Sequence, residues 1–265
     1  VKVESNGEIK FKGKSIKKML LDGDDLFDLQ YVVGSKNIDI DMVEKIQAIE
    51  NFNENTLLKG ISDSDEVALN IKLKKGKTDF SGNAKIGYGL IDKYDSSFTG
   101  LLLNSKNKSF GLLSYNNIGT NNSPYNFQSD LVTIENLKEE SLLSKDIIKQ
   151  GNFNSQLEDS RANLNTNFYT NFNTLHKVSK TITSRLNFGF YDDKLSRSNS
   201  TYSDYNLSNN SFVTSEKELL KKNPQIISGN FQLLSKQSHK CNWEYLGKVK
   251  YQDIYFRSLS TNNYE

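Results

Sequence analysis

The sequence predicts a mainly β fold: a small α/β segment followed by the antiparallel strands of a truncated transmembrane β-barrel. Three observations support this prediction. Apolar and polar residues alternate with period two over runs of about 10 residues, the length at which a tilted strand crosses a bilayer. Phe and Tyr are frequent, although hydrophobic residues make up only 35% of the chain. Short turns and long connections fall on opposite ends of the strand series.

Composition excludes several other classes of protein. The 265 residues carry a formal net charge of +2 and 11% aromatic residues, whereas disordered chains have few aromatic residues and a high net charge. This small charge identifies no nucleic-acid partner. No segment approaches the roughly 20 apolar residues of a transmembrane helix. The single cysteine, Cys241, rules out an internal disulfide framework.

The first residues are predicted to form two short hairpins. Asn6-Gly7 separates the alternating segments Val1–Ser5 and Glu8–Lys12, because this dipeptide supplies the positive φ angles of a hairpin turn. Gly13-Lys14 offers a second turn. A small sheet therefore begins near the first residue of the sequence.

Strands and one helical turn are predicted between residues 17 and 75. Lys17–Leu21 is an apolar strand that stops at Asp22-Gly23. Residues 25–33 are too irregular to assign. Asp39 is a candidate N-cap for one short helical turn before Met42. Two further strand predictions are an uneven one at Glu44–Glu50 and a cleanly alternating one at Val67–Leu73.

The character of the sequence changes at residues 76–79, where we place the boundary between residues 1–78 and residues 79–265. Beyond it the strands are long. In residues 162–176, Leu164, Phe168 and Phe172 share one face, and asparagines fill the other. Asparagine amides suit the wet lumen of a barrel, since they bond to water without the desolvation cost of a charge. The other alternating runs are Phe80–Leu90, Thr181–Tyr191 and Cys241–Tyr251.

The connections between these strands differ in length. Residues 105–108 and 177–180 are short turns, whereas Gly119–Arg161 and Lys194–Ser203 are longer loops rich in Ser and Asn. A short turn at residues 91–95 departs from this asymmetry. Because hydrocarbon offers no partner for backbone N–H and C=O groups, strands in lipid must form a closed sheet. Residues 79–265 hold about eight strands against the 22 of plugged transporters, so we expect a fragment that is cut at both ends.

No metal or cofactor site is predicted. Asp22-Gly23-Asp24-Asp25 lacks the spacing and the distal Glu of a calcium loop, and a solvated turn fits it better. The acidic run at residues 62–66 reads as a loop before a strand. His239 and Cys241 supply two ligands, fewer than the three or four that zinc requires.

No enzyme and no catalytic residue are predicted either. His176 and His239 lie at strand ends, and no Gly-x-Ser-x-Gly motif accompanies them. The acidic residues Asp192-Asp193 and Asp204 are interpreted as solvated charge at an outer rim.

Aromatic residues fit a girdle at a membrane interface. The members of the predicted girdle are Trp243, Tyr245, Tyr251, Phe188, Phe190 and Tyr191. The alternative is the core of a soluble β-sandwich, which alternating strands also build. Gly34, Gly60 and the glycines from Gly82 to Gly89 are expected to serve tight backbone geometry.

Residues 7–90 also contain eight short pieces in the order and spacing of a known family. They are Gly7-Glu-Ile, Gly13-Lys14-Ser-Ile-Lys-Lys, Leu21-Asp22-Gly23, Lys36-Asn37-Ile38, Val43-Glu-Lys-Ile-Gln47, Gly60-Ile61-Ser-Asp63, Leu69-Asn70-Ile-Lys-Leu-Lys-Lys75 and Gly82-Asn83-Ala-Lys-Ile-Gly87-Tyr88-Gly89. Through them the sequence resembles the TonB-dependent receptors of Bacteroidetes. These are outer-membrane β-barrel proteins with a carboxypeptidase-like regulatory domain ahead of the plug domain.

The resemblance implies that residues 1–78 are the C-terminal part of a plug domain and that residues 79–265 begin the barrel. Structural plug residues would then be Gly13, Lys14, Asp22, Gly23, Lys36, Asn37, Gly60 and Asn70. The implied location is the outer membrane of a Gram-negative bacterium, with outer-membrane lipid, TonB and an unidentified nutrient as partners. The implied function is energy-coupled uptake, and the alternative is a surface structural or adhesion β-protein that transports nothing.

Overall fold

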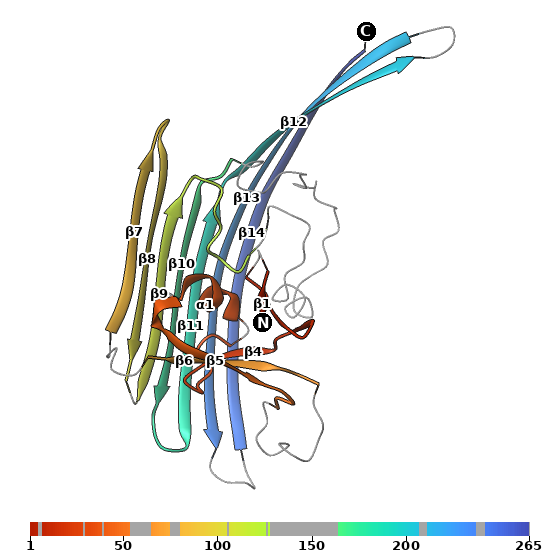
Figure 1. The fold of residues 1–265 in the computed structure, drawn as a ribbon. Coiled ribbons are helices and arrows are strands. Elements are labelled where there is room, and N and C mark those ends of the chain that lie inside the picture. Colours follow the sequence, from red (N-terminus) through yellow and green to blue (C-terminus); the bar gives the residue numbers. More distant parts are fainter. Residues whose placement is uncertain are drawn as a thin grey trace.

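The computed structural model describes residues 1–4, 7–28, 30–38, 40–53, 65–74, 80–104, 106–125, 127, 164–206, 211–236 and 242–264. Within these ranges the protein has three sheets and one α-helix (Figure 1). The prediction of a mainly β fold with antiparallel strands is confirmed. In the described ranges, no helix combines the length and the apolar character that crossing a membrane requires.

Residues 1–74, here called the N-terminal unit, begin with a three-stranded antiparallel sheet. Its strands are β1 (Lys2–Val3), β2 (Ile9–Phe11) and β3 (Lys14–Ser15). The hairpin between β1 and β2 confirms the prediction made from Asn6-Gly7, and Gly7 has a φ of +87°. The second turn lies one residue earlier than predicted. Lys12 and Gly13 have φ angles of +50° and +83°, and Lys14 already belongs to β3.

A second, mixed sheet has the order β4-β6-β5, with β4 and β6 parallel and β5 antiparallel to β6. Its strands are β4 (Lys18–Leu21), β5 (Val43–Ile49) and β6 (Ala68–Leu73). The connection from β4 to β5 contains α1 (Tyr31–Asn37) and the 3-10 helix η1 (Ile40–Met42). The helical turn expected before Met42 is confirmed, whereas its candidate cap Asp39 lies outside the described residues.

Sequence reasoning missed α1 because this helix lacks the usual signals. Gln30 occupies its N-cap and makes no side-chain capping bond. Tyr31, Val32 and Val33 are consecutive and all buried, so no amphipathic stripe is visible. Gly34 then allows close packing, since a Cβ on it would lie 2.8 Å from Phe27 Cε2. Tertiary packing therefore stabilises a helix that its own residues favour only weakly.

The third sheet, here called the large sheet, contains eight strands paired antiparallel (Figure 1). They are β7 (Phe80–Gly89), β8 (Lys93–Leu103), β9 (Asn107–Asn116), β10 (Asn167–Lys177), β11 (Ile182–Asp193), β12 (Leu195–Asn206), β13 (Ser211–Lys236) and β14 (Asn242–Tyr264). Among the described residues β7, β12 and β14 each have one partner strand, and β11 and β12 lie end to end along the same side of β13. The ends of β12, β13 and β14 extend beyond the other strands as a narrow ribbon.

The prediction of a loop at residues 194–203 is wrong, because β12 lies there. β12 follows β11 end to end along β13. Asp192 pairs with Gln225 and Leu195 pairs with Lys222, which is one uninterrupted register along β13. The two strands are separated where Pro224 lies in β13, since proline has no N–H to donate to the ladder. Serines and asparagines are tolerated in β12 because most of its side chains are solvent-exposed or only half-buried.

The two faces of the large sheet differ in environment. Along β10, Asn167, Asn171 and Asn173 are buried, and Phe168 and Phe172 on the opposite face are half-buried and exposed, respectively. We call the first face the covered face, because the N-terminal unit lies against it, and the second the open face (Figure 1). This alternation confirms the faces expected from the sequence.

Tyr191 corrects one detail of the predicted aromatic girdle. It is 1% exposed and lies on the covered face, with its ring 5.5 Å from Tyr125 and 5.7 Å from Phe127 between centroids. Phe188 and Phe190 have even residue numbers, whereas Tyr191 has an odd one, so the two phenylalanines lie on the opposite, open face. Tyr191 was assigned by residue type, although the alternation itself places it on the opposite side.

Candidate functional site

The candidate site is the contact between the covered face and the acidic loop, which we define as residues 22–28. The loop begins with a tight turn after β4, in which Asp22 and Gly23 have φ angles of +50° and +86°. Leu21 and Asp24 close the turn with two backbone hydrogen bonds of 2.8 and 3.1 Å. This geometry is that of a type I′ turn, so the predicted Asp22-Gly23 turn is confirmed.

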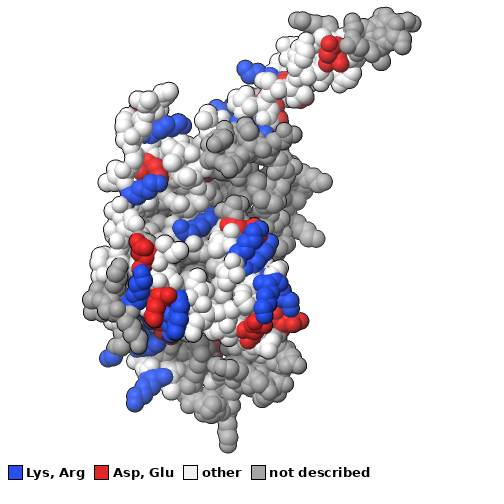
Figure 2. Space-filling view, in the orientation of Figure 1, with Lys and Arg blue, Asp and Glu red and all other residues white. Residues whose placement is uncertain are grey.

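Basic side chains from three neighbouring strands of the large sheet bind the acidic loop. Asp24 Oδ2 lies 2.8 Å from the ammonium groups of both Lys108 on β9 and Lys177 on β10. Asp25 Oδ2 lies 2.6 Å from Arg185 Nη1 on β11. Basic and acidic groups also lie next to one another on the surface of the side that carries the N-terminal unit (Figure 2).

Arg185 binds a second carboxylate, since its Nη2 lies 3.0 Å from Asp28 Oδ1. Lys18 of the N-terminal unit lies 2.7 Å from Asp25 and 3.4 Å from Asp28. The side chain of Arg185 is only 4% exposed, and those of Asp25 and Asp28 are 20% and 12% exposed. These ions are largely removed from water, so each depends on its partners.

Electrostatics favours the ionised form of two carboxyls of the acidic loop. Burial opposes the charge on Asp25, but Arg185 and Lys18 outweigh it and lower the pKa of this carboxyl below its ordinary value. Burial also opposes the charge on Asp24, and hydrogen bonds from Lys108 and Lys177 lower the pKa of that carboxyl. The solvated turn expected from the sequence is therefore wrong for Asp24 and Asp25, which have protein ammonium and guanidinium groups as their cations.

Amides and apolar groups complete the contact. Asn187 Nδ2 donates to the Leu26 carbonyl at 3.1 Å, and Asn171 Nδ2 donates to Gln30 Oε1 at 3.3 Å. Phe27 meets Phe110 of β9 edge to face, with 5.2 Å between ring centroids. The asparagines of the covered face thus bind the N-terminal unit directly.

Three of the residues singled out by the family resemblance act together at the base of the acidic loop. The Gly23 amide donates to Asn70 Oδ1 at 2.8 Å, and Asn70 Nδ2 donates to Gln47 Oε1 at 3.1 Å. Asp22 Oδ1 accepts from the Leu73 amide at 3.4 Å. These bonds fix the turn on the mixed sheet and so determine the direction in which the acidic side chains project.

Lys36 and Asn37 form a second group at the end of α1. Lys36 Nζ donates to the carbonyls of Asn121 and Ser123 at 3.2 and 2.9 Å, and Asn37 Nδ2 donates to the Asn122 carbonyl at 3.2 Å. They therefore join the helix to the segment that follows β9.

The remaining singled-out residues are not part of these groups. Gly13 and Lys14 lie on the separate β2–β3 hairpin, where Lys14 forms an exposed ion pair of 3.2 Å with Asp65. Gly60 lies outside the described residues, as do residues 62–64 and the pair His239 and Cys241.

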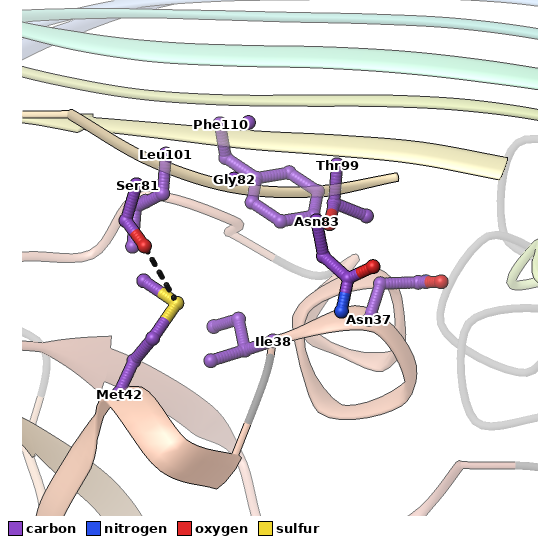
Figure 3. A pocket seen from close by; sticks show the side chains of 10 residues that line it. Asn37, Ile38, Met42, Ser81, Gly82, Asn83, Thr99, Leu101 and Phe110 are labelled. Carbon is purple, nitrogen blue, oxygen red and sulfur yellow. Dashed lines mark hydrogen bonds between the residues drawn. The ribbon is translucent and has the colours of Figure 1, made fainter. Parts of the chain in front are cut away.

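A small crevice lies where α1 and η1 approach β7 and β8 (Figure 3). Its empty volume of about 250 Å³ includes open solvent, below the roughly 300–1,000 Å³ of an ordinary ligand pocket. Ser81 Oγ donates across it to Met42 Sδ at 3.4 Å. Gly82 is required here, because a Cβ would lie 2.8 Å from the Thr99 carbonyl oxygen. The tight geometry expected at Gly34 and Gly82 is thus confirmed.

Within the described ranges, no group of three or more His, Cys, Asp and Glu side chains could hold a metal ion. His176 is exposed on β10 and contacts Asn107. No family model matches the chain, and a search of curated proteins finds no match. The acidic loop and its three basic strands therefore have to be interpreted from their own geometry.

Proposed function

We propose that the chain belongs to an outer-membrane receptor of the TonB-dependent kind, in which the large sheet is part of a barrel wall and the N-terminal unit is part of the plug. The supporting observation is the polarity of the large sheet. A sheet of a soluble protein packs its apolar face on the core and turns its polar face to water. Here the covered face carries buried Asn, Lys and Arg side chains beside apolar ones such as Phe110 and Leu175, and the open face is apolar and bare.

The bare apolar side chains form a continuous band because they occupy matching register positions. Phe98 on β8 pairs with Leu113 on β9, and Phe172 on β10 pairs with Phe188 on β11. The same face continues to β14. Its other exposed members are Phe80, Ile86, Tyr88, Leu102, Tyr115, Leu186, Ile227, Phe231, Tyr245, Val249 and Tyr251. An apolar band of this extent indicates a surface that contacts lipid or another apolar phase.

Strand lengths agree with a membrane wall. The strands from β7 to β11 contain 10 to 12 residues each. A tilted strand of about 9–11 residues spans the hydrocarbon core. Trp243 and Tyr245 near the start of β14 carry the aromatic surface toward one end of the sheet, where an interfacial girdle lies in membrane barrels.

The polar contact suits a removable plug. Ion pairs and hydrogen bonds from amide side chains hold the acidic loop to three strands. These groups can be solvated again when the N-terminal unit and the large sheet separate. In the proposed mechanism, the nutrient binds at outer loops and the N-terminal unit. TonB then pulls on the plug and breaks these contacts, which admits the nutrient to the periplasm. The chemistry of the site does not specify the nutrient.

A surface structural or adhesion protein is the second candidate, and the ribbon of β12, β13 and β14 favours it. This ribbon projects beyond the rest of the sheet, as a surface-presenting element would (Figure 1). The two candidates share a membrane location and differ in their dependence on TonB.

The chain contains a single tryptophan, Trp243, which is 40% exposed and supports a direct test. The full chain is reconstituted into vesicles, and Trp243 emission is recorded with ordinary and with brominated acyl chains. Contact with lipid predicts strong quenching by bromine and weak quenching by aqueous iodide. The opposite pattern would exclude the membrane wall.

A second test is made in cells. Deletion of TonB should abolish uptake of the nutrient, whereas unchanged uptake would eliminate the transport proposal and leave the surface protein as the explanation.

A further inference from the structure

A row of four polar residues crosses the large sheet on its covered face. Asp95 on β8 pairs with Asn116 on β9, Asn116 pairs with Asn167 on β10, and Asn167 pairs with Asp193 on β11. Asp95 is 7% exposed, and the other three are fully buried. Side chains paired directly across antiparallel strands have Cβ atoms about 4.5–5.5 Å apart, so each member of this polar row faces the next.

Within the part of the chain that the structure describes, several atoms of the polar row have no hydrogen-bond partner. They are Asn116 Oδ1 and Nδ2, Asn167 Oδ1 and Asp193 Oδ1, joined by Thr120 Oγ1 and Asn165 Nδ2 beside the row. A buried polar atom left without a partner destabilises the fold, and a charged one does so more strongly. Four of these six atoms are oxygens, which can bind a donor or a cation, and two are amide nitrogens, which only donate; together they indicate a missing binding partner.

The orientation of the Asn167 amide shows which of its atoms is free. Asn167 Nδ2 donates to Asp193 Oδ2 at 3.1 Å, which leaves Asn167 Oδ1 as a free acceptor. Tyr191 also donates to Asp193 Oδ2, at 3.0 Å. Both side-chain donors to Asp193 are therefore neutral, and its second oxygen is unbound. The row presents a buried carboxylate oxygen and a neighbouring amide oxygen to which no cationic side chain of the described residues donates.

Asp95 at the other end of the polar row differs, because it forms an ion pair with Lys85 of β7. Within the described ranges Asp193 forms no such ion pair. Asn116 stands between the two halves, and its unconstrained amide is able to turn Oδ1 toward Asn167. The Gly119 amide donates to Asn165 Oδ1 at 2.8 Å. This hydrogen bond holds the next residue, Thr120, near Asn165.

We propose that Asn116, Asn167 and Asp193 bind a hard cation of the size of calcium, with Thr120 and water completing the coordination. Carboxylate, amide and hydroxyl oxygens are the ligands that calcium takes, usually six to eight in a flexible arrangement. One unpaired carboxylate gives a low ligand charge, so affinity falls in the weak range of about 10⁻⁴–10⁻³ M. This site does not depend on the transport proposal, since it arises from the sheet and the segment that follows β9.

Terbium binds calcium sites and emits when a nearby phenol absorbs, and Tyr191 lies beside Asp193. The full chain is titrated with Tb³⁺ under excitation of tyrosine. Saturable emission that Ca²⁺ displaces, and that Mg²⁺ displaces less well, is the expected result. Asp193→Asn should abolish this emission. Asp192→Asn is the matched control, because it removes the same charge one residue away on the opposite face, and it should retain the emission.

Two further measurements allow for a folding defect in the first variant. Millimolar Ca²⁺ should raise the unfolding temperature of the wild type and of Asp192→Asn, and not that of Asp193→Asn. Asn116→Asp adds a second carboxylate and should tighten Ca²⁺ binding at least tenfold. Equal emission from the wild type and Asp193→Asn, or no effect of Asn116→Asp on affinity, would overturn the proposal and leave ordered water alone in the polar row.

Discussion

Arg185 Nη1 lies 2.6 Å from Asp25 Oδ2, although the two residues are 160 positions apart in the chain. The same guanidinium group donates to the Asp25 carbonyl oxygen at 3.0 Å and lies 3.0 Å from Asp28. One buried side chain of β11 thus neutralises two carboxylates of the acidic loop. It connects the N-terminal unit to the large sheet more directly than any apolar contact described above.

Replacement of Arg185 with alanine should destabilise this contact strongly. Removing one partner of a buried ion pair leaves an uncompensated charge and costs about 3–5 kcal/mol. Urea unfolding would measure the loss, and hydrogen exchange should show faster exchange in residues 24–28. Arg257→Ala, at an exposed position of β14, is the control and should change stability by less than about 0.5 kcal/mol. Equal effects of the two substitutions would show that the ion pairs do not hold the loop.

Acid should weaken the same contact. The folded-state pKa values of Asp24 and Asp25 are lowered, so their contribution is complete above the unfolded value of 3.8 and is lost as pH falls from there toward the folded values. Urea midpoints measured from pH 6 down to pH 3 should decline for the wild type. Asp25→Asn should show a shallower decline, and an identical slope for both proteins would contradict the assignment.

Gly34→Ala should be destabilising by about 1–3 kcal/mol because the new methyl group would overlap Met19 and Phe27. In a helix without such contacts, this substitution would stabilise the fold by about 1 kcal/mol. The sign of the change in stability therefore shows whether Gly34 is tightly packed. Gly247→Ala on β14 is the control, since a Cβ there meets nothing within 4 Å. Thermal unfolding of the two variants checks the difference, and a rise in stability for Gly34→Ala would refute the tight packing of α1.

The turn between β7 and β8 is strained at Ile91, which has a φ of +59° and is 92% exposed. A left-handed conformation costs an ordinary residue roughly 1–2 kcal/mol, and asparagine tolerates it better. Ile91→Asn should therefore raise the free energy of unfolding by about 0.5–1 kcal/mol. Val178→Asn, at an exposed turn position without a positive φ, should give no gain. Similar gains from both changes would point to lower surface hydrophobicity instead.

Local periodicity predicted the faces of the strands well. The parity of Phe168 and Asn171 in β10 is enough to place them on opposite sides, since side-chain alternation needs no knowledge of the rest of the chain. The tight turns at Gly7 and Gly23 were predictable for the same reason, because glycine favours positive φ locally.

Long-range features could not be predicted in this way. Alternation places Arg185 and Asn187 on a polar face, but it does not show that the acidic loop lies against that face. Asp24 forms ion pairs with Lys108 and Lys177, which are so distant in the sequence that no motif connects them to Asp24. β12 was missed because its exposed side chains need no apolar pattern, although its backbone pairs fully with β13. Barrel closure, TonB coupling and the transported nutrient remain predictions.

The position of Pro224 near the base of the ribbon of β12, β13 and β14 has a consequence for how the ribbon transmits force. The 12 residues of β12 correspond to a lever about 40 Å long at roughly 3.3 Å per residue. Rotation of about 10° at its base would displace the tip by about 7 Å over that length. The base of this lever is Lys194, whose neighbour Asp193 ends the polar row. A force applied to the tip is therefore transmitted to the large sheet beside Asp193, through β13 and β14, which continue without a break past Pro224.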